Sequence, residues 1–234
     1  DGYSLVAPQC RWPIDITASS RHRWIDGRWH TPTGENLELK VPARTVEETR
    51  GNGTPYQRNR SREKFASVAL AGQPAKNFAW NAVAYAQDQS FASTFSSVNA
   101  TRTAETPASD QFNVPATAFG AAWTGAWSHA DGARTSAGAD ARFVRGETRE
   151  HFTLVNGAFT RLRVAGGTQA VGGLFALHEQ PLAPGLRVTL GARLDRWTDT
   201  SGHRRESDRA TNTASRNDHY AALDGGSITL ALAT

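Results

Sequence analysis

The sequence has a single cysteine, no methionine and no long apolar run. One cysteine, Cys10, excludes an internal disulfide framework and a multi-cysteine zinc site, so we expect it to be an incidental loop residue. No segment approaches the roughly 18 consecutive apolar residues of a transmembrane helix. Transmembrane strands stay open, because each needs only about 9–11 alternating residues.

Large aliphatic side chains are also scarce for a chain of 234 residues. Hydrophobic residues make up 38 %, and much of the small apolar content is alanine, so a conventional core rich in Leu, Ile and Val is undersupplied. The net charge of +4 comes mostly from arginines that are scattered along the chain. Because no compact basic patch interleaved with aromatics occurs, we expect no nucleic-acid partner.

Alternation of apolar and polar residues is the pattern that the sequence does contain. In GLRVTLGARLDRW (185–197), Leu, Val, Leu, Ala and Leu at every second position alternate with Arg, Thr, Gly, Arg and Asp. Successive side chains of a strand point to opposite faces, so this segment has one apolar and one polar face. Nine such strands are predicted, at residues 21–30, 37–46, 62–71, 78–89, 116–129, 136–146, 168–179, 186–197 and 219–233.

Short and long connections alternate strictly between these predicted strands. Four are short and rich in turn-forming residues (31–36, 72–77, 130–135 and 180–185), and four are long and polar (47–61, 90–115, 147–167 and 198–218). In an up-and-down meander this places tight turns at one end and large loops at the other, as in outer-membrane barrels. We therefore predict an all-β fold: an antiparallel, up-and-down transmembrane β-barrel segment of about eight to nine strands.

Aromatic residues near the ends of the predicted strands suit the two interfacial girdles of such a barrel. They are Phe78, Trp80, Trp127, Phe143 and Trp197.

Three stretches carry a resemblance to a known family. GTQAVGGLFALHEQPLAPGLRVTLGARLDRWTDTSG (167–202) resembles the barrel of TonB-dependent outer-membrane receptors, in which a short turn with proline leads into alternating apolar residues and G-x-R-x-D. Here that motif is Gly191, Arg193 and Asp195. The stretches at 68–98 and 135–150 look similar to other hairpins of these barrels. The resemblance covers roughly residues 21–220, so we predict one barrel domain over 1–234 whose ends, 1–20 and 221–234, match poorly.

The resemblance implies a receptor in the outer membrane of a Gram-negative cell that takes up a scarce ligand, such as an iron–siderophore complex or cobalamin. It implies the TonB–ExbB–ExbD complex, outer-membrane lipid and lipopolysaccharide as partners, and binding and gating without catalysis or a cofactor. It also implies a plug domain, a TonB box and about 22 strands. Because this sequence shows neither the plug nor the box, and opens on DGYSLVAP, we expect a fragment of a receptor.

The ligand-binding candidates are charged residues of the predicted strands and aromatic residues of the predicted loops. Charges on a lipid-facing surface cost up to about 2–4 kcal/mol each at the bilayer midplane, so the strand charges should face the lumen. We expect a charge ladder within the wall more than direct ligand contact. The lumen candidates are Arg187, Arg193, Asp195, Asp140 and Arg142, and the loop candidates are Tyr56, Phe91 and Phe95, with Phe112 and Phe159 in similar settings.

Three other functions stay open. A small closed barrel of eight strands with a structural or adhesion role requires pairing of the first and last strands. An outer-membrane hydrolase requires a Ser–His–acid cluster in the long loops, although the seven histidines are dispersed, and we expect His203 and His219 to be solvated rather than to bind a metal. A soluble β protein requires a filled interior and a polar exterior.

Overall fold

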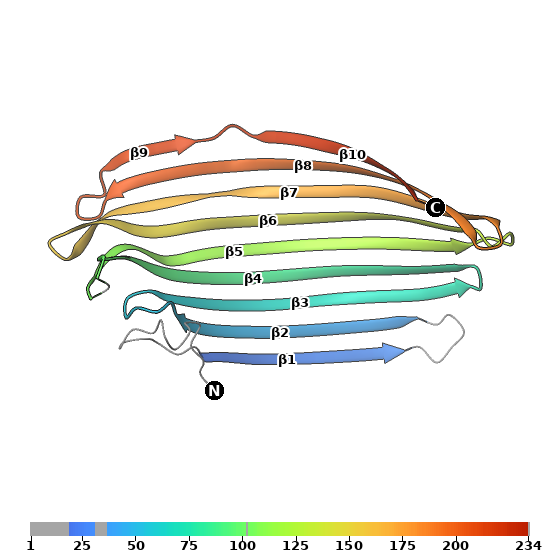
Figure 1. Cartoon of the computed structure of the whole chain (residues 1–234), viewed down its shortest axis with the longest axis horizontal. Coiled ribbons are helices and arrows are strands. Elements are labelled where there is room, and N and C mark those ends of the chain that lie inside the picture. Colours follow the sequence, from blue (N-terminus) through green and yellow to red (C-terminus); the bar gives the residue numbers. More distant parts are fainter. Residues whose placement is uncertain (1–18, 31–36, 102, 234) are drawn as a thin grey trace.

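The computed structural model describes residues 19–30, 37–101 and 103–233, and its ten strands form one antiparallel sheet (Figure 1). Each of the first eight strands pairs with the next, and the last two strands both pair with the eighth, which confirms the predicted up-and-down meander. The strands are β1 Ser19–His30, β2 Glu38–Gly51, β3 Arg58–Ala75, β4 Phe78–Val98, β5 Glu105–Ser128, β6 Arg134–Val155, β7 Ala158–Ala183, β8 Leu186–Asp208, β9 Ala214–His219 and β10 Leu223–Ala233.

The last predicted strand, 219–233, is found mainly as β10, whereas β9 lies mostly within the predicted loop 198–218. The two strands lie end to end along β8, so the last row of the sheet is divided into two (Figure 1). The division lies beside a β-bulge in β8, where Ser201 and Gly202 occupy the space opposite one residue of β7. Ser201 has a φ of 55°, and the amide of Tyr220 donates a hydrogen bond to the carbonyl of Gly202 at 2.8 Å. The bulge bends β8 and interrupts the ladder, so the sheet has nine rows of strands, as predicted.

The sheet is open. β1 forms one edge and β10 the other, at opposite sides of the molecule (Figure 1). Within the described ranges these two strands do not pair with each other, so the alternative of a small closed barrel of eight strands is wrong for this chain.

The prediction of four long loops was wrong, because most residues of these segments belong to strands. The predicted loop 147–167 contains only the turn at Asn156 and Gly157, whose φ values of 50° and 80° suit a two-residue hairpin. The other long connections shrink to residues 52–57, 99–104 and 209–213. These hairpins are largely polar on both faces, so they lack the alternation of apolar and polar residues from which the strands were predicted.

The two faces of the sheet differ in chemistry. Directly paired residues share a face, and one register row, from β2 to β10, is apolar throughout: Leu39, Leu70, Ala82, Trp123, Ala139, Leu174, Leu194 and Ile228. We call this side the apolar face and the opposite side the polar face. Leu174 is 59 % exposed and Leu194 is 51 % exposed, so the apolar face is uncovered in the chain by itself.

The apolar face ends at a definite row. Four residues along the strands from Leu70 and Trp123, the row still contains Ala66, Ala86, Phe119 and Phe143. The next row on this face is polar from β1 to β8: Arg23, Thr45, Lys64, Asp88, Thr117, Arg145, Thr168 and Thr200. On β8 and β10 the change comes earlier, at Arg196 and Asp224. A slanted boundary is expected of strands that are tilted across a membrane.

We call the part on the short-turn side of this boundary the apolar band, and the part beyond it the extension. The aromatic residues expected in girdles lie at the ends of the band on the apolar face, where Phe78 stacks on Trp127 with a centroid distance of 4.9 Å. Trp197 is the exception. It lies on the polar face over Gly225, because it pairs in register with Val171 rather than with a residue of the apolar face.

The sheet has almost no buried core. Among the described residues, Ala133 is the one buried hydrophobic residue. A soluble β protein requires a filled interior, so that alternative is wrong for this sheet.

Candidate functional site

Three of the predicted lumen residues meet on the polar face of the apolar band. Arg193 of β8 contacts Asp195 of the same strand at 2.7 Å and Asp140 of β6 at 2.9 Å. The strand between them, β7, pairs with both neighbours at Gly173. The predicted charge ladder therefore exists as a cross-strand cluster of one arginine and two carboxylates.

Gly173 is what allows this cluster to cross β7. A Cβ atom at this position would lie 2.3 Å from Nη2 of Arg193 and 2.6 Å from Oδ1 of Asp195. The guanidinium group therefore lies in the space that any other residue would fill, and from there it reaches Asp140. A second glycine on the same face works alike, because the ring of Tyr85 lies over Gly120, with its Cε1 atom 2.3 Å from the position of a Cβ.

The other two predicted lumen residues have different surroundings. Arg187 forms an ion pair with Glu179 of β7 near the short turns. Arg142 is exposed, and no ion pair joins it to another described residue. It lines a hollow of about 480 Å³ with Val144, Gln169 and Asp199. The side-chain amide of Gln169 donates a hydrogen bond of 3.0 Å to Asp199. The glycines Gly146, Gly167 and Gly202 also line this hollow.

Of the predicted loop aromatics, only Tyr56 lies in a loop. Its amide donates to Oε1 of Glu105 at 2.9 Å, and its carbonyl accepts from Thr94, so the residue ties the β2–β3 connection to the β4–β5 hairpin. Partial burial, with the negative charges of Asp110 and Glu105, raises the pKa of the Tyr56 phenol. Burial opposes ionisation of Glu105, but hydrogen bonds from Thr54, Ser96 and the Tyr56 amide lower its pKa.

The expectation that Phe91 and Phe95 belong to loops was wrong, because both lie within β4. They share the parity of Tyr85 along this strand, which places them on the polar face. Phe112 and Phe159 are also strand residues, in β5 and β7. Phe112 stacks on His151 at a centroid distance of 4.3 Å.

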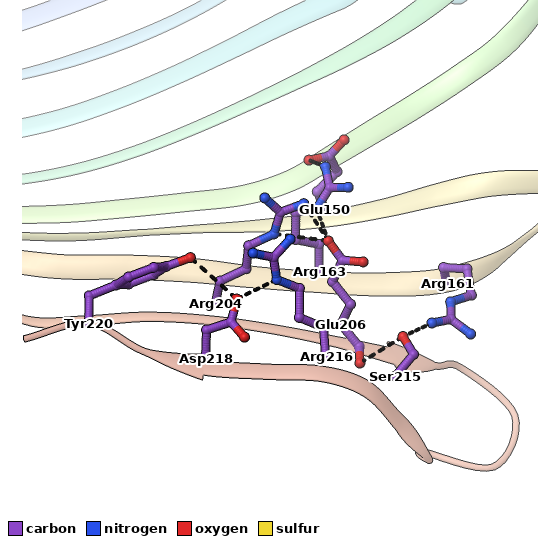
Figure 2. Close-up of polar contacts among 9 residues, drawn as sticks. All are labelled: Glu150, Arg161, Arg163, Arg204, Glu206, Ser215, Arg216, Asp218 and Tyr220. Atoms are coloured by element: carbon purple, nitrogen blue, oxygen red, sulfur yellow. Dashed lines mark hydrogen bonds and ion pairs between the residues drawn. The ribbon is translucent and has the colours of Figure 1, made fainter.

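The largest polar cluster lies in the extension and was not predicted (Figure 2). Arg163 of β7 is its centre, with Nε 2.9 Å from Oε1 of Glu206 and Nη1 3.4 Å from Oε2 of Glu150. Its guanidinium carbon also lies 4.3 Å from the centre of the Phe152 ring. Arg204 donates to the same Glu206 oxygen from Nε at 2.9 Å. The cluster therefore links β6, β7 and β8 on the polar face.

The cluster continues on β9 (Figure 2). Arg216 pairs with Asp218, the hydroxyl of Tyr220 donates to Asp218 at 3.4 Å, and Arg161 donates to the hydroxyl of Ser215. Hydrogen bonding from Arg204, followed by the contact with Arg163, lowers the pKa of Glu206 despite its burial. The signal that could have found these residues is the spacing of charged residues at every second position, Arg161 with Arg163 and Arg204 with Glu206, which is compatible with strands inside the predicted loops.

Two histidines lie close to carboxylates, in an arrangement that a catalytic or metal-binding site would extend with further groups. His151 lies 3.7 Å from Asp110 and His203 lies 3.2 Å from Glu147, and in the described part of the chain neither pair includes a serine hydroxyl. Over the same residues, no group of three His, Cys, Asp or Glu side chains is placed to hold a metal ion. No described helix is long and apolar enough to cross a membrane.

The sheet is an up-and-down meander with one apolar band, tight turns at one end and paired charges on the opposite face. This architecture agrees with a match to a protein-family model. A family model described as TonB dependent receptor-like, beta-barrel, matches residues 13–225. The chain belongs to this family. A comparison with the curated proteins found no match.

Membership confirms the resemblance predicted from the sequence. TonB-dependent receptors are outer-membrane transport proteins and not enzymes, and their barrels present an apolar band to lipid. By the orientation usual in this family, we call the apolar face of this sheet the lipid-facing side, and the polar face with Arg193, Asp140 and Asp195 the lumen-facing side.

Proposed function

We propose that this chain forms the wall of an outer-membrane receptor that takes up a scarce ligand, such as an iron–siderophore complex or cobalamin. Uptake would be energised by the TonB–ExbB–ExbD complex of a Gram-negative cell. The observation that supports this proposal most directly is the separation of the two faces. One row of eight strands is apolar, while the charged side chains of the same segments gather on the opposite face.

The lumen-facing charges have two different roles in this proposal. Arg193, Asp140 and Asp195 satisfy one another, so they brace the wall across β7. Arg142 has no ion-pair partner among the described residues and borders a hollow, so it is the better candidate for direct contact with an anionic group of the ligand. A free guanidinium group suits carboxylate or phosphate recognition because it offers paired donors.

The remaining candidates have supporting roles. Arg187 is held by Glu179 near the short turns. Phe91 and Phe95 offer apolar surface on the polar face of the extension, and Tyr56 holds two hairpins together beside them.

Transport measurements test this function. The gene that encodes this chain is deleted, and uptake is measured for a radio-iron-loaded hydroxamate siderophore, a radio-iron-loaded catecholate siderophore and radio-cobalt-labelled cobalamin. We expect the deletion to abolish uptake of at least one probe, and a protonophore to abolish the same uptake in the parent strain. Unchanged uptake of all three probes after deletion would overturn the proposal.

A charge variant then tests the role of Arg142. Arg142→Gln should raise the probe concentration that gives half-maximal uptake several-fold. Arg145→Gln removes the same charge three residues away on the lipid-facing side and should leave that concentration unchanged. Equal effects of the two variants would exclude a specific role for Arg142.

A further inference from the structure

Two histidines converge on one hydroxyl group at the short-turn end of the sheet. Nε2 of His129 lies 2.8 Å from Oγ1 of Thr135, and Nδ1 of His178 lies 2.9 Å from the same oxygen. The centroids of the two imidazole rings are 6.1 Å apart. His129 directly follows β5, Thr135 lies in β6 and His178 lies in β7. We call His129 and His178 the histidine pair, since two imidazole nitrogens approach one point from the two sides of β6.

The register places the histidine pair at the end of the apolar band. Thr135 and His178 share the row of Phe78 and Trp127, which lies on the apolar face. This row is next to the turn between β5 and β6, where His129 is exposed. The pair is therefore open to water at one end of the band, on the side opposite to the lumen-facing charges.

The position of the proton on His178 is fixed by Gln180. The side-chain nitrogen of Gln180 donates to the carbonyl of Pro181 at 3.3 Å and to the carboxylate of Asp131 at 3.4 Å, so its oxygen faces His178. That oxygen lies 3.3 Å from Nε2 of His178 and can only accept. Nε2 therefore carries the proton, and Nδ1 of the neutral ring keeps a lone pair. Histidines that bind metals are oriented in this way, by an acceptor on the other ring nitrogen.

The groups around Thr135 can supply a second lone pair at the same point. The Thr135 hydroxyl donates to Nδ1 of His178, so its oxygen accepts from Nε2 of His129. Because His129 is exposed, this proton can move to its other ring nitrogen through water. Negative charge lies beside the pair, since the amide of Ala133 donates to Asp131 at 3.1 Å and lowers its pKa. Two imidazole nitrogens near an ionised carboxylate are a donor set for a divalent cation.

We propose that the histidine pair binds one divalent transition-metal ion and that it prefers Cu²⁺. Imidazole suits Cu²⁺, Ni²⁺ and Zn²⁺, and Cu²⁺ is the strongest binder of this series. Among the described residues no three His, Cys, Asp or Glu side chains are placed around one ion, so the pair supplies two ligands. The other positions are left to the Thr135 hydroxyl and water. This open arrangement differs from the closed four-ligand sites of structural Zn²⁺.

The bound ion links two strands that the ladder does not join. β5 and β7 both pair with β6 but not with each other. An ion held by the pair connects the end of β5 to β7, and because it binds the folded sheet it raises the Tm. This inference does not rest on the proposed uptake function, because the pair lies on the lipid-facing side and away from the lumen-facing charges.

Titration of the purified full chain with Cu²⁺ tests the proposal, in detergent micelles and without a histidine tag. Calorimetry measures the affinity, and pulsed electron paramagnetic resonance counts the imidazoles on the ion. We expect one tightly bound Cu²⁺ with two imidazoles and a rise in Tm. His129→Gln and His178→Gln should each abolish that rise and weaken binding by more than about tenfold, since even an outer partner of a ligating histidine contributes about 10–100-fold.

The matched controls are His151→Gln and His203→Gln, because each removes an imidazole that lies beside one carboxylate, Asp110 or Glu147. Support requires that both controls bind Cu²⁺ like the parent. Equal weakening in all four variants would overturn the proposal, because scattered histidines would then account for the binding. A resonance signal from one imidazole, or unchanged binding in the variants of the pair, would overturn it as well.

Tryptophan fluorescence shows that each variant is folded, and because the two variants of the pair are measured separately, either one is a sufficient test. A failed transport assay with intact Cu²⁺ binding would reject the proposed uptake function alone.

Discussion

From Phe78 to Ala86, β4 places only apolar side chains on the lipid-facing side, whereas from Asp88 onward that side of the strand is mostly polar. The apolar band and the extension are thus continuous in backbone but built for different solvents. In the band, the charged cluster lies on one face, where Arg193 gathers two carboxylates. In the extension, contacts such as Glu147–His203 and Arg163–Glu206 occur on both faces. The same strands run through both parts, but in the extension β-bulges interrupt the ladder, in β8 at Ser201 and Gly202 and between β4 and β5 beside Phe91.

The largest expected difference between the band and the extension is in the cost of adding one arginine to the lipid-facing side of each. Ala121 lies on the apolar face near the middle of the band, and Thr117 lies on the same face of β5 in the first polar row. Ala121→Arg should destabilise the protein by about 2–4 kcal/mol, and Thr117→Arg by about 0–1 kcal/mol. Urea unfolding in lipid vesicles measures both. Equal losses would show that the boundary is misplaced.

The glycines of β7 offer a smaller test within the band. At Gly172 an added Cβ would lie 3.6 Å from the nearest atom, so Gly172→Ala should stabilise the strand by about 0.5–1 kcal/mol through the lower entropy of the unfolded chain. At Gly173 the Cβ would displace the Arg193 guanidinium group. Gly173→Ala should therefore not show the stabilisation expected for Gly172→Ala. The same unfolding measurement compares the two, and a gain of equal size in both variants would contradict the role given to Gly173.

The smallest expected effect lies in the extension and depends on pH. The pKa of Glu206 in the folded protein lies below its ordinary value of 4.5, because Arg204 and Arg163 hold the ionised form. The resulting stabilisation is complete above the ordinary pKa and is lost as the pH falls through the lowered one. At pH 7 the parent should therefore have a higher Tm than Glu206→Gln, with a difference that shrinks on acidification below 4.5. A difference independent of pH would show that ionisation of Glu206 is not involved.

The strands of the band could be predicted because their pattern is local. Segments such as 186–197 have one apolar face and one polar face, and the central residues of every predicted strand lie in a strand of the sheet. The strands of the extension were missed because both of their faces are largely polar, so no regular alternation of apolar and polar residues marks them. One local signal was present there, since Asn156 and Gly157 form the kind of pair that closes a two-residue hairpin.

The candidate site was predicted in part, because the face on which a strand residue lies also follows from the local alternation. Arg193, Asp195 and Asp140 were assigned to the polar face from parity alone, and the structure brings all three together. Parity also placed Arg142 on that face, but nothing in the sequence showed that it lacks an ion-pair partner while Arg193 has two. The cluster of Glu150, Arg163 and Glu206 was missed because its residues lie in segments predicted to be loops.

The sequence by itself determined which side chains share a face, because alternation along a strand depends only on neighbours in the chain. It thereby specified an all-β sheet with one side suited to lipid. The tertiary structure alone decided which residues meet across strands, because register is fixed by pairing over the whole length and a slip of one residue would reverse every face. Asp140 and Arg193 are 53 positions apart, and they meet only because β7 places Gly173 between them.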